Sequence, residues 1–136
     1  MSAANQDIAN ELAEAIKAAV NKRTPLAIAG SGSKRFYTGE AAGEKLDVTD
    51  HRGIVSYEPT ELVITARAGT PLAEIEAALA DKGQMLAFEP PYFGEAATLG
   101  GTIACGFSGP RRSYAGAARD HVLGARIING KGEILH

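Results

Sequence analysis

Two glycine-rich segments of this chain carry residue types that bind phosphate. The first contains Gly30, Ser31, Gly32, Ser33 and Lys34, directly after a short apolar run. Its glycines let the backbone turn so that several N–H groups converge, which suits phosphate oxygens. The serines add hydroxyl donors and the lysine adds positive charge. The segment predicts a phosphate-binding loop, although so short a motif taken alone is more often an ordinary flexible turn.

The first segment differs from the two best-known nucleotide-binding loops. In a Walker A loop a glycine precedes the lysine and Ser or Thr follows it, whereas here Ser33 precedes Lys34 and Arg35 follows it. A Rossmann fingerprint needs a third glycine at the position that Arg35 occupies. An ATP- or NAD-binding domain is therefore the weaker alternative.

The second segment, residues 97–112, offers another surface to the same ligand. Gly100 and Gly101 leave room for a ligand to lie against the backbone. Polar and cationic side chains follow at spacings that suit an extended anion: Thr98, Thr102, Ser108, Arg111 and Arg112. A structural glycine loop over the core is the alternative for this segment by itself. Two such loops in one short chain favour a shared ligand, and a dinucleotide with a central pyrophosphate has the right length and charge.

Residue spacing assigns no catalytic group. Cys105 has no sequence neighbour that would stabilise a thiolate, so a buried, unreactive thiol is expected. The histidines His51, His121 and His136 are far apart, which predicts no metal site. The residues therefore predict ligand binding and leave the catalytic residues unknown.

Helices and strands alternate in the elements that would position these loops. Apolar residues recur every four positions over 8–20, which predicts an amphipathic helix. Thr70 and Pro71 are predicted to start a second helix, with Thr70 as its N-cap, and Gly83 to end it as a left-handed cap. A polar loop is expected over 30–45. Strands are predicted at 26–29, 46–49, 53–58, 62–68 and 85–88.

The pattern changes between residues 89 and 120, where periodicity is lost and glycine and proline are frequent. A loop of this length inside a domain is usually functional. A strand over 121–128, which includes His121, precedes Asn129-Gly130, a signal for a tight hairpin turn. The second hairpin strand has barely begun at His136, so we expect the native protein to continue. Together the elements predict an α/β or α+β layered structure.

Composition indicates one globular domain and narrows its partners. The 136 residues carry a net charge of -2, which gives no reason to expect nucleic-acid binding. No apolar run approaches the roughly 18 residues of a membrane span. The polar N-terminus lacks the apolar core of a signal peptide, and a single cysteine fits a reducing compartment. We therefore expect a cytoplasmic protein without a membrane span of its own.

Taken together, the motifs resemble the FAD-binding domain of the vanillyl-alcohol oxidase (p-cresol methylhydroxylase, PCMH-type) superfamily. The resemblance lies in residues 29–34, in Thr98-Leu-Gly-Gly-Thr-Ile-Ala104, in their spacing, and in Val122-Leu-Gly-Ala-Arg-Ile-Ile128. Within that superfamily the chain is most similar to the FAD-binding E subunits of bacterial glycolate oxidases. The similar segments are 46–55, 59–67, 83–86, 89–91 and 109–112.

This resemblance implies an α+β FAD-binding PCMH-type fold, with the first subdomain complete over 1–88 and the second only begun over 89–136. It implies that residues 30–34 hold the pyrophosphate of FAD, mainly through backbone N–H groups. Gly109 and Tyr114 would lie near the same cleft, and Val122 would approach the adenosine side. The residues lining the ribityl chain and the flavin would be Pro90, Thr98, Gly100, Gly101, Thr102, Ala104 and Cys105.

The resemblance also implies an FAD-dependent oxidoreductase subunit. Non-covalent FAD is expected, because Ser33-Lys34 occupies the region where some members attach FAD through a histidine. In the intact complex FAD would accept a hydride from glycolate or another small 2-hydroxy acid.

The expected partners are a second FAD-binding subunit and an iron–sulfur subunit, through which the chain would reach the inner membrane. The present portion alone is expected to be inactive. The rival from a different class is a non-catalytic assembly module or vestigial fragment without flavin affinity.

Overall fold

The first helix forms where the apolar spacing predicts it. The computed structural model describes residues 5–136, so the first four residues of the expected 1–88 subdomain lie outside it. Helix α1, Ala9–Lys22, buries Leu12 and Ala13 and ends at Arg23, whose φ of 55° is left-handed. The expected helix is confirmed and extends two residues beyond residue 20.

Strand β1, Leu26–Ala29, pairs in parallel with β2, Glu44–Asp47, so that Ile28 lies opposite Leu46. Parallel strands need a long crossover, and here residues 30–43 provide it. The predicted loop contains a short helix, α2, Arg35–Thr38, which we did not expect. β2 also begins and ends two residues earlier than the strand predicted over 46–49.

A β-hairpin followed by one helix contributes several of the buried core residues. Strands β3, Ile54–Glu58, and β4, Val63–Ala66, pair antiparallel and precede α3, Leu72–Ala80. These elements confirm the predicted strands and helix. The apolar face of α3 supplies the core: Leu72, Ile75 and Leu79 are all buried. Gly83 is left-handed, with a φ of 67°, as its position after the helix predicts.

Two predictions around α3 are wrong. Pro71 occupies the N-cap position of α3, and no side chain caps it. The Thr70 hydroxyl instead donates to the carbonyl of Gly53 (3.2 Å) and accepts from its N–H (2.9 Å). Residues 85–88 form no strand. Phe88 is buried and its ring stacks on His121 at 5.9 Å, so tertiary packing and not strand pairing explains this apolar run.

The segment predicted as a long loop contains three short helices. They are α4, Leu99–Cys105, α5, Arg112–Ala115, and the 3-10 helix η1, Ala118–His121. Thr98 caps α4 by accepting a hydrogen bond from Gly101 N at 3.2 Å, and left-handed Gly106 ends it. Two glycines inside α4 hide it from a propensity argument, because glycine disfavours helix interiors.

The strand predicted over 121–128 is wrong for most of its length. His121 belongs to η1, and only β5, Ile127–Ile128, is extended and paired. β5 forms the predicted hairpin with β6, Ile134–Leu135. Its connection is wider than the tight turn expected at Asn129-Gly130, because Asn129 N donates to the Glu133 carbonyl at 3.0 Å and Gly132 takes the left-handed conformation.

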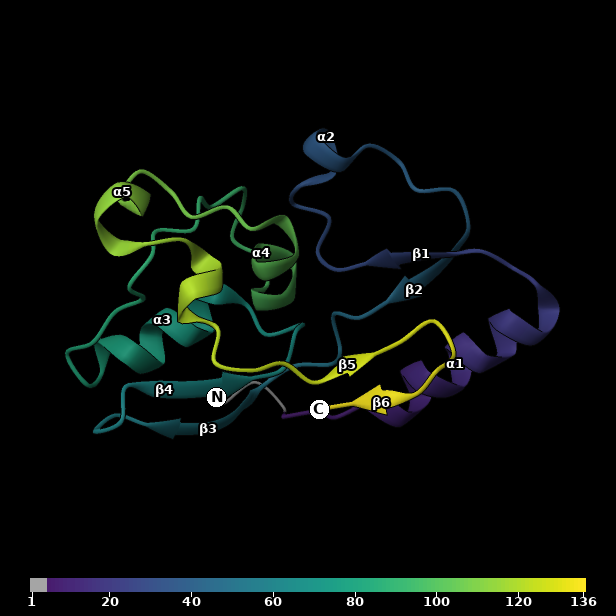
Figure 1. Cartoon of the computed structure of the whole chain (residues 1–136), viewed down its shortest axis with the longest axis horizontal. Helices are drawn as coiled ribbons and strands as arrows, with labels where there is room; N and C mark the ends of the chain where they lie inside the picture. The colour runs from purple at the N-terminus through teal and green to yellow at the C-terminus, as the bar shows by residue number, and fades with distance from the viewer. Residues whose placement is uncertain (1–4) are drawn as a thin grey trace.

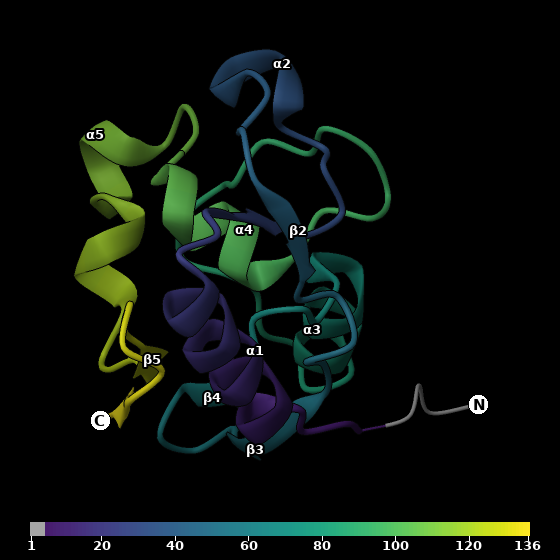
Figure 2. The same cartoon turned by 90° about the vertical axis from the view of Figure 1, so that its right-hand side faces the viewer.

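The elements have a mixed helix and strand content, as an α+β fold requires. In Figure 1, α1 and the β5–β6 hairpin lie together at one end of the molecule, and α3 with β3 and β4 lies at the other. In Figure 2 the C-terminal part of the chain runs along one side. None of the helices in the described part combines the length and apolar character needed to cross a membrane.

Asp7 ties the start of α1 to two distant parts of the chain. Its carboxylate accepts from Ala9 N at 3.0 Å and lies 3.3 Å from Nη2 of Arg67 and 3.2 Å from Nη2 of Arg126. Arg67 follows β4 and Arg126 precedes β5. The Ala9 hydrogen bond, together with the two guanidinium groups, lowers the pKa of Asp7 to about 2.

Asp7→Asn is expected to destabilise the fold at about pH 7 by ~0.5–1 kcal/mol, a small value because the side chain is 42% exposed. The folded-state pKa lies below the unfolded value of ~3.9, so this contribution is complete above about pH 4 and is lost as the pH falls toward 2. Urea denaturation at about pH 7 and pH 2.5 measures it. Asp81→Asn, at an exposed carboxylate, is the control. If the free energies of unfolding of the wild type and of Asp7→Asn differ by the same amount at both pH values, this account is contradicted.

Candidate functional site

The start of α4 is held in place by the segment that leads into α3. Leu72 N donates to the Ala97 carbonyl (2.9 Å), Leu99 N to the Thr70 carbonyl (2.9 Å) and Gly100 N to the Ala68 carbonyl (2.8 Å). Pro71 and Thr98 form an isolated antiparallel bridge. Residues 97–100 therefore run beside residues 68–72 as an added strand would, and this pairing fixes where the second glycine-rich segment points.

The two glycine-rich segments meet in space, as the shared-ligand hypothesis requires. A Cβ added to Gly30 would stand 3.4 Å from Oγ1 of Thr98. One added to Gly101 would stand 3.2 Å from the same hydroxyl and 4.0 Å from Nζ of Lys34. Gly30 and Lys34 of the first segment thus lie beside Thr98 and Gly101 of the second. These four residues form what we call the glycine junction.

Lys34 is the unusual member of the glycine junction. The residue is only 6% exposed, yet among residues 5–136 no carboxylate lies within ion-pair distance of its ammonium and no hydrogen bond to it is found. Burying a charged group is unfavourable unless it is paired. A lysine placed in this way is available to pair with an anion.

Backbone donors are free on one side of the glycine junction and occupied on the other. Within the described chain, the N–H groups of residues 31–34 make no hydrogen bond to protein. At the start of α4 the situation is reversed: the N–H groups of residues 99–102 all have protein acceptors. An anion at the junction would therefore take its backbone hydrogen bonds from residues 31–34, and from α4 only side-chain hydroxyls.

The remaining candidate residues of α4 face in different directions. The absence of a side chain at Gly100 allows close packing against Ala68, because a Cβ on Gly100 would stand 2.7 Å from Cβ of Ala68. Thr102 is buried, and its hydroxyl has no partner among the described residues. Ala104 is exposed and Cys105 half-buried. Thr98 and Gly101 are thus the α4-side residues of the glycine junction, and Gly101 is the one beside the Lys34 ammonium.

Three further candidates lie away from the glycine junction contacts. Gly109, with a φ of 72°, packs so tightly on Glu89 that any Cβ would overlap the Glu89 carbonyl. Pro90, next to Glu89, is buried. Tyr114 is 94% exposed. Gly109 and Pro90 therefore join two loops, and the structure places Tyr114 at the surface of α5.

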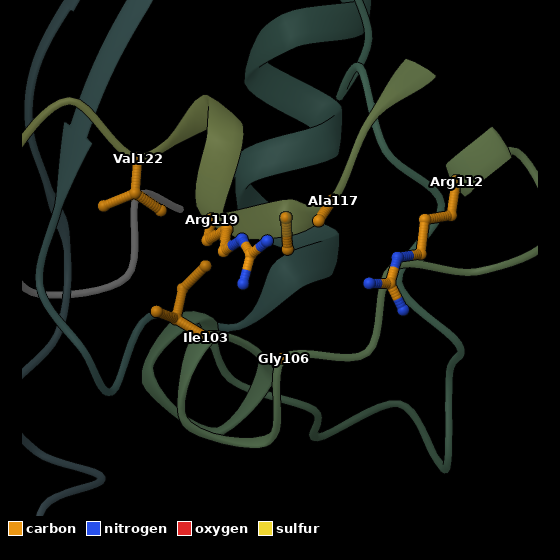
Figure 3. Close-up of a pocket in the computed structure, with 7 residues that line it drawn as sticks. Ile103, Gly106, Arg112, Ala117, Arg119 and Val122 are labelled. Atoms are coloured by element: carbon orange, nitrogen blue, oxygen red, sulfur yellow. The ribbon is translucent and has the colours of Figure 1, made fainter. Parts of the chain in front are cut away.

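Val122 belongs to a separate cavity of about 400 Å³, within the range of small-molecule sites, roughly 300–1,000 Å³. Figure 3 shows the guanidinium groups of Arg112 and Arg119 directed into it from α5 and η1. Arg112 was proposed from sequence, whereas Arg119 was missed. Its only signal was a positive charge near Val122, inside a segment expected to be loop. The lining residues are Ile103, Gly106, Arg112, Ala117, Ala118, Arg119 and Val122.

Two buried threonines provide a matched test of the packing around the glycine junction. Thr70→Val removes both hydrogen bonds to Gly53, and should destabilise the fold by ~1–3 kcal/mol because buried partners lose their bonds. Thr102→Val removes a buried hydroxyl without a partner, and should leave stability unchanged or raise it. Urea denaturation of the ligand-free chain measures both. Equal effects from the two substitutions would contradict the assigned hydrogen bonds.

Comparison with known proteins adds information that the geometry alone does not carry. A family model described as an FAD binding domain matches residues 7–136. The chain is 57% identical over 129 residues to the glycolate oxidase subunit GlcE of Escherichia coli (strain K12). That match covers 95% of this chain but 37% of the relative. The chain therefore spans little more than a third of the length of the curated relative it matches.

Proposed function

The chain belongs to the FAD binding domain family, and on that premise we propose that its glycine junction holds the pyrophosphate of FAD. The observation that carries the proposal is Lys34, a residue only 6% exposed whose ammonium has no acidic partner among the described residues. FAD brings a negatively charged pyrophosphate, which would complete the missing pair. The free N–H groups of residues 31–34 would donate to the phosphate oxygens.

The residues present fit this group. Gly30 leaves the space beside the Thr98 hydroxyl free of a side chain, and Gly101 does so beside the Lys34 ammonium. Thr98 adds a hydroxyl that can donate to an anion while accepting from Gly101 N. We propose non-covalent attachment, since Ser33 and Lys34 stand where a covalent link to histidine would be made. The remaining candidates Pro90, Gly100, Thr102, Ala104 and Cys105 would lie along the ribityl chain and the flavin.

We propose that the adenosine end of FAD lies toward the cavity beside Val122. The volume of about 400 Å³ suits part of such a ligand, and the apolar side chains of Ile103 and Val122 suit an aromatic base. Arg112 and Arg119 add positive charge to the same opening. This arrangement would extend the ligand from the glycine junction past α4.

The similarity to a glycolate oxidase subunit supports a wider proposal about the assembly. We propose that the chain is the FAD-binding part of a 2-hydroxy acid oxidoreductase, with subdomains meeting near residue 88 and with flavin and iron–sulfur subunits as partners. The chemistry that FAD supplies there is acceptance of a hydride from the substrate. The residues of this chain bind and orient the cofactor. They supply donors and charge at the pyrophosphate, and no proton transfer is assigned to them.

A competition titration tests the proposed function. The purified chain is titrated with FAD by flavin fluorescence, and the bound FAD is then displaced with ADP, FMN or NAD. We expect saturable FAD binding and displacement by ADP, which carries the pyrophosphate. FMN lacks the pyrophosphate, so it should compete at least about tenfold more weakly than ADP. That factor corresponds to the free energy of one charge-assisted hydrogen bond. Absence of FAD binding would favour the vestigial module, and equal competition by FMN would contradict the role of residues 30–34.

A further inference from the structure

Four aromatic rings link the outlying helix α2 to the second half of the chain. Phe36 meets Phe93 edge to face, with ring centroids 4.9 Å apart, and Tyr37 meets Phe107 in the same way at 5.0 Å. Phe93 and Phe107 are themselves 6.1 Å apart. The rings thus form one continuous chain, Phe36–Phe93–Phe107–Tyr37, which we call the aromatic clasp.

The aromatic clasp lies at the surface and not in the core. Phe36 is 71% exposed, Tyr37 64% and Phe93 38%. Figures 1 and 2 both show α2 at the outer edge of the molecule, beyond β1 and β2. Phe36 and Tyr37 remain largely in contact with water, whereas Phe93 and Phe107 are partly covered, so the two rings of α2 contribute little of the burial that stabilises the core. Their geometry points to a role in holding α2 in one position.

The helix that the clasp holds begins directly after the buried lysine. Lys34 precedes the first residue of α2, and its carbonyl accepts hydrogen bonds from Tyr37 N (3.0 Å) and Thr38 N (3.2 Å). Gly32 and Gly39 flank the helix with φ values of 75° and 71°, and no atom lies within 4 Å of a Cβ added to Gly39. The segment therefore has a glycine at each end around which its backbone can turn.

The geometry points to Phe93 and Phe107 as positioning residues: they hold α2 closed, and so keep Lys34 buried at the glycine junction and slow the release of a bound diphosphate ligand. The inference rests on the proposed function for its ligand, and extends it with a device that controls access. Phe93 contacts Phe36 of α2 and Phe107. Its removal would leave Tyr37–Phe107 as the remaining aromatic pair of the clasp, and should loosen α2 without opening the core.

The test measures the exposure of Lys34 and the release of FAD separately. Reductive methylation of the ligand-free chain, read by mass spectrometry, gives the labelling rate of each lysine. Phe93→Ala and Phe36→Ala should raise the rate at Lys34 at least about threefold, in line with the loss of aromatic pairs. The rate at exposed Lys82 should not change. The same variants should release FAD faster by a similar factor in a stopped-flow chase.

Matched variants separate positioning from general packing. Phe93→Tyr keeps a ring and should restore slow labelling at Lys34, whereas Met85→Ala, at an exposed apolar residue outside the clasp, should change nothing. Thermal unfolding of the ligand-free Phe36→Ala variant should match the wild type. An unchanged Lys34 rate in both alanine variants would overturn the inference. A wild type that binds no FAD would instead refute the proposed function, and the labelling result would still decide the role of the clasp.

Discussion

Lys34→Met is expected to weaken FAD binding by about 10- to 100-fold and, in the same protein, to stabilise the ligand-free fold. The first effect follows from losing a charge-assisted contact to the pyrophosphate, worth ~1.5–3 kcal/mol. The second follows because a residue only 6% exposed carries a cation with no acidic partner in the described chain, and an apolar side chain of similar length removes the cost of partly desolvating that charge. We expect a gain of up to about 1 kcal/mol, because the desolvation is partial.

The Lys34→Met variant should bind FAD more weakly and yet have a more stable ligand-free fold. A substitution that simply disrupted the structure would lower both the affinity and the stability. FAD titration gives the change in Kd, and urea denaturation of the ligand-free chain gives the change in the free energy of unfolding. Lys82→Met, at an exposed position, is the matched control and should change neither quantity. A Lys34→Met protein that is both less stable and weaker in binding would show that Lys34 has a structural partner, contrary to this account.

Gly109→Ala is expected to destabilise the fold by ~2–5 kcal/mol, a large share of the ~5–15 kcal/mol that holds a typical domain together. Two terms add. A non-glycine residue at a φ of 72° is strained by ~1–2 kcal/mol. The new methyl group would also overlap the Glu89 carbonyl, whose carbon would stand 2.8 Å away, and relieving such overpacking costs about 1–3 kcal/mol.

Gly106→Ala separates the two terms. Gly106 has a similar φ of 65°, but no atom lies within 4 Å of an added Cβ. That variant should therefore show only the backbone strain, ~1–2 kcal/mol. Urea denaturation of both variants gives the difference. Equal destabilisation would mean that the loop containing Gly109 moves freely away from Glu89, and that Gly109 does not fix the two loops to each other.

The sequence predicted the first phosphate-binding segment well because local rules decide it. Gly30 and Gly32 follow a short apolar strand, and the backbone after such a strand must turn. The sequence predicted that the segments containing Gly30 and Thr98 bind one ligand, but it did not predict their direct contact. No local rule brings together residues that are so far apart in the sequence. The burial of Lys34 without an acidic partner is a tertiary property, and its sequence signal was merely a lysine beside glycines.

Long apolar patterns were predicted correctly, whereas segments rich in glycine were not. Leu72, Ile75 and Leu79 recur at helical spacing, and α3 forms accordingly. Helix α4 was missed because its two glycines lower helix propensity, and the pairing of residues 97–100 with 68–72 outweighs that preference. The strand expected over 85–88 failed for a related reason: Phe88 packs against His121, and its short apolar run has no partner strand in the described chain.

The most direct test of the central claim is an amide NMR titration of the 15N-labelled chain with FAD. The account predicts that the largest shifts fall on the N–H groups of residues 31–34, which are free in the described structure. The N–H groups of residues 99–102, already bonded within the protein, should shift less. The same titration with Lys34→Met should reduce the shifts at residues 31–34. Saturable FAD binding with no shift at residues 31–34 would contradict the claim that this loop holds the pyrophosphate.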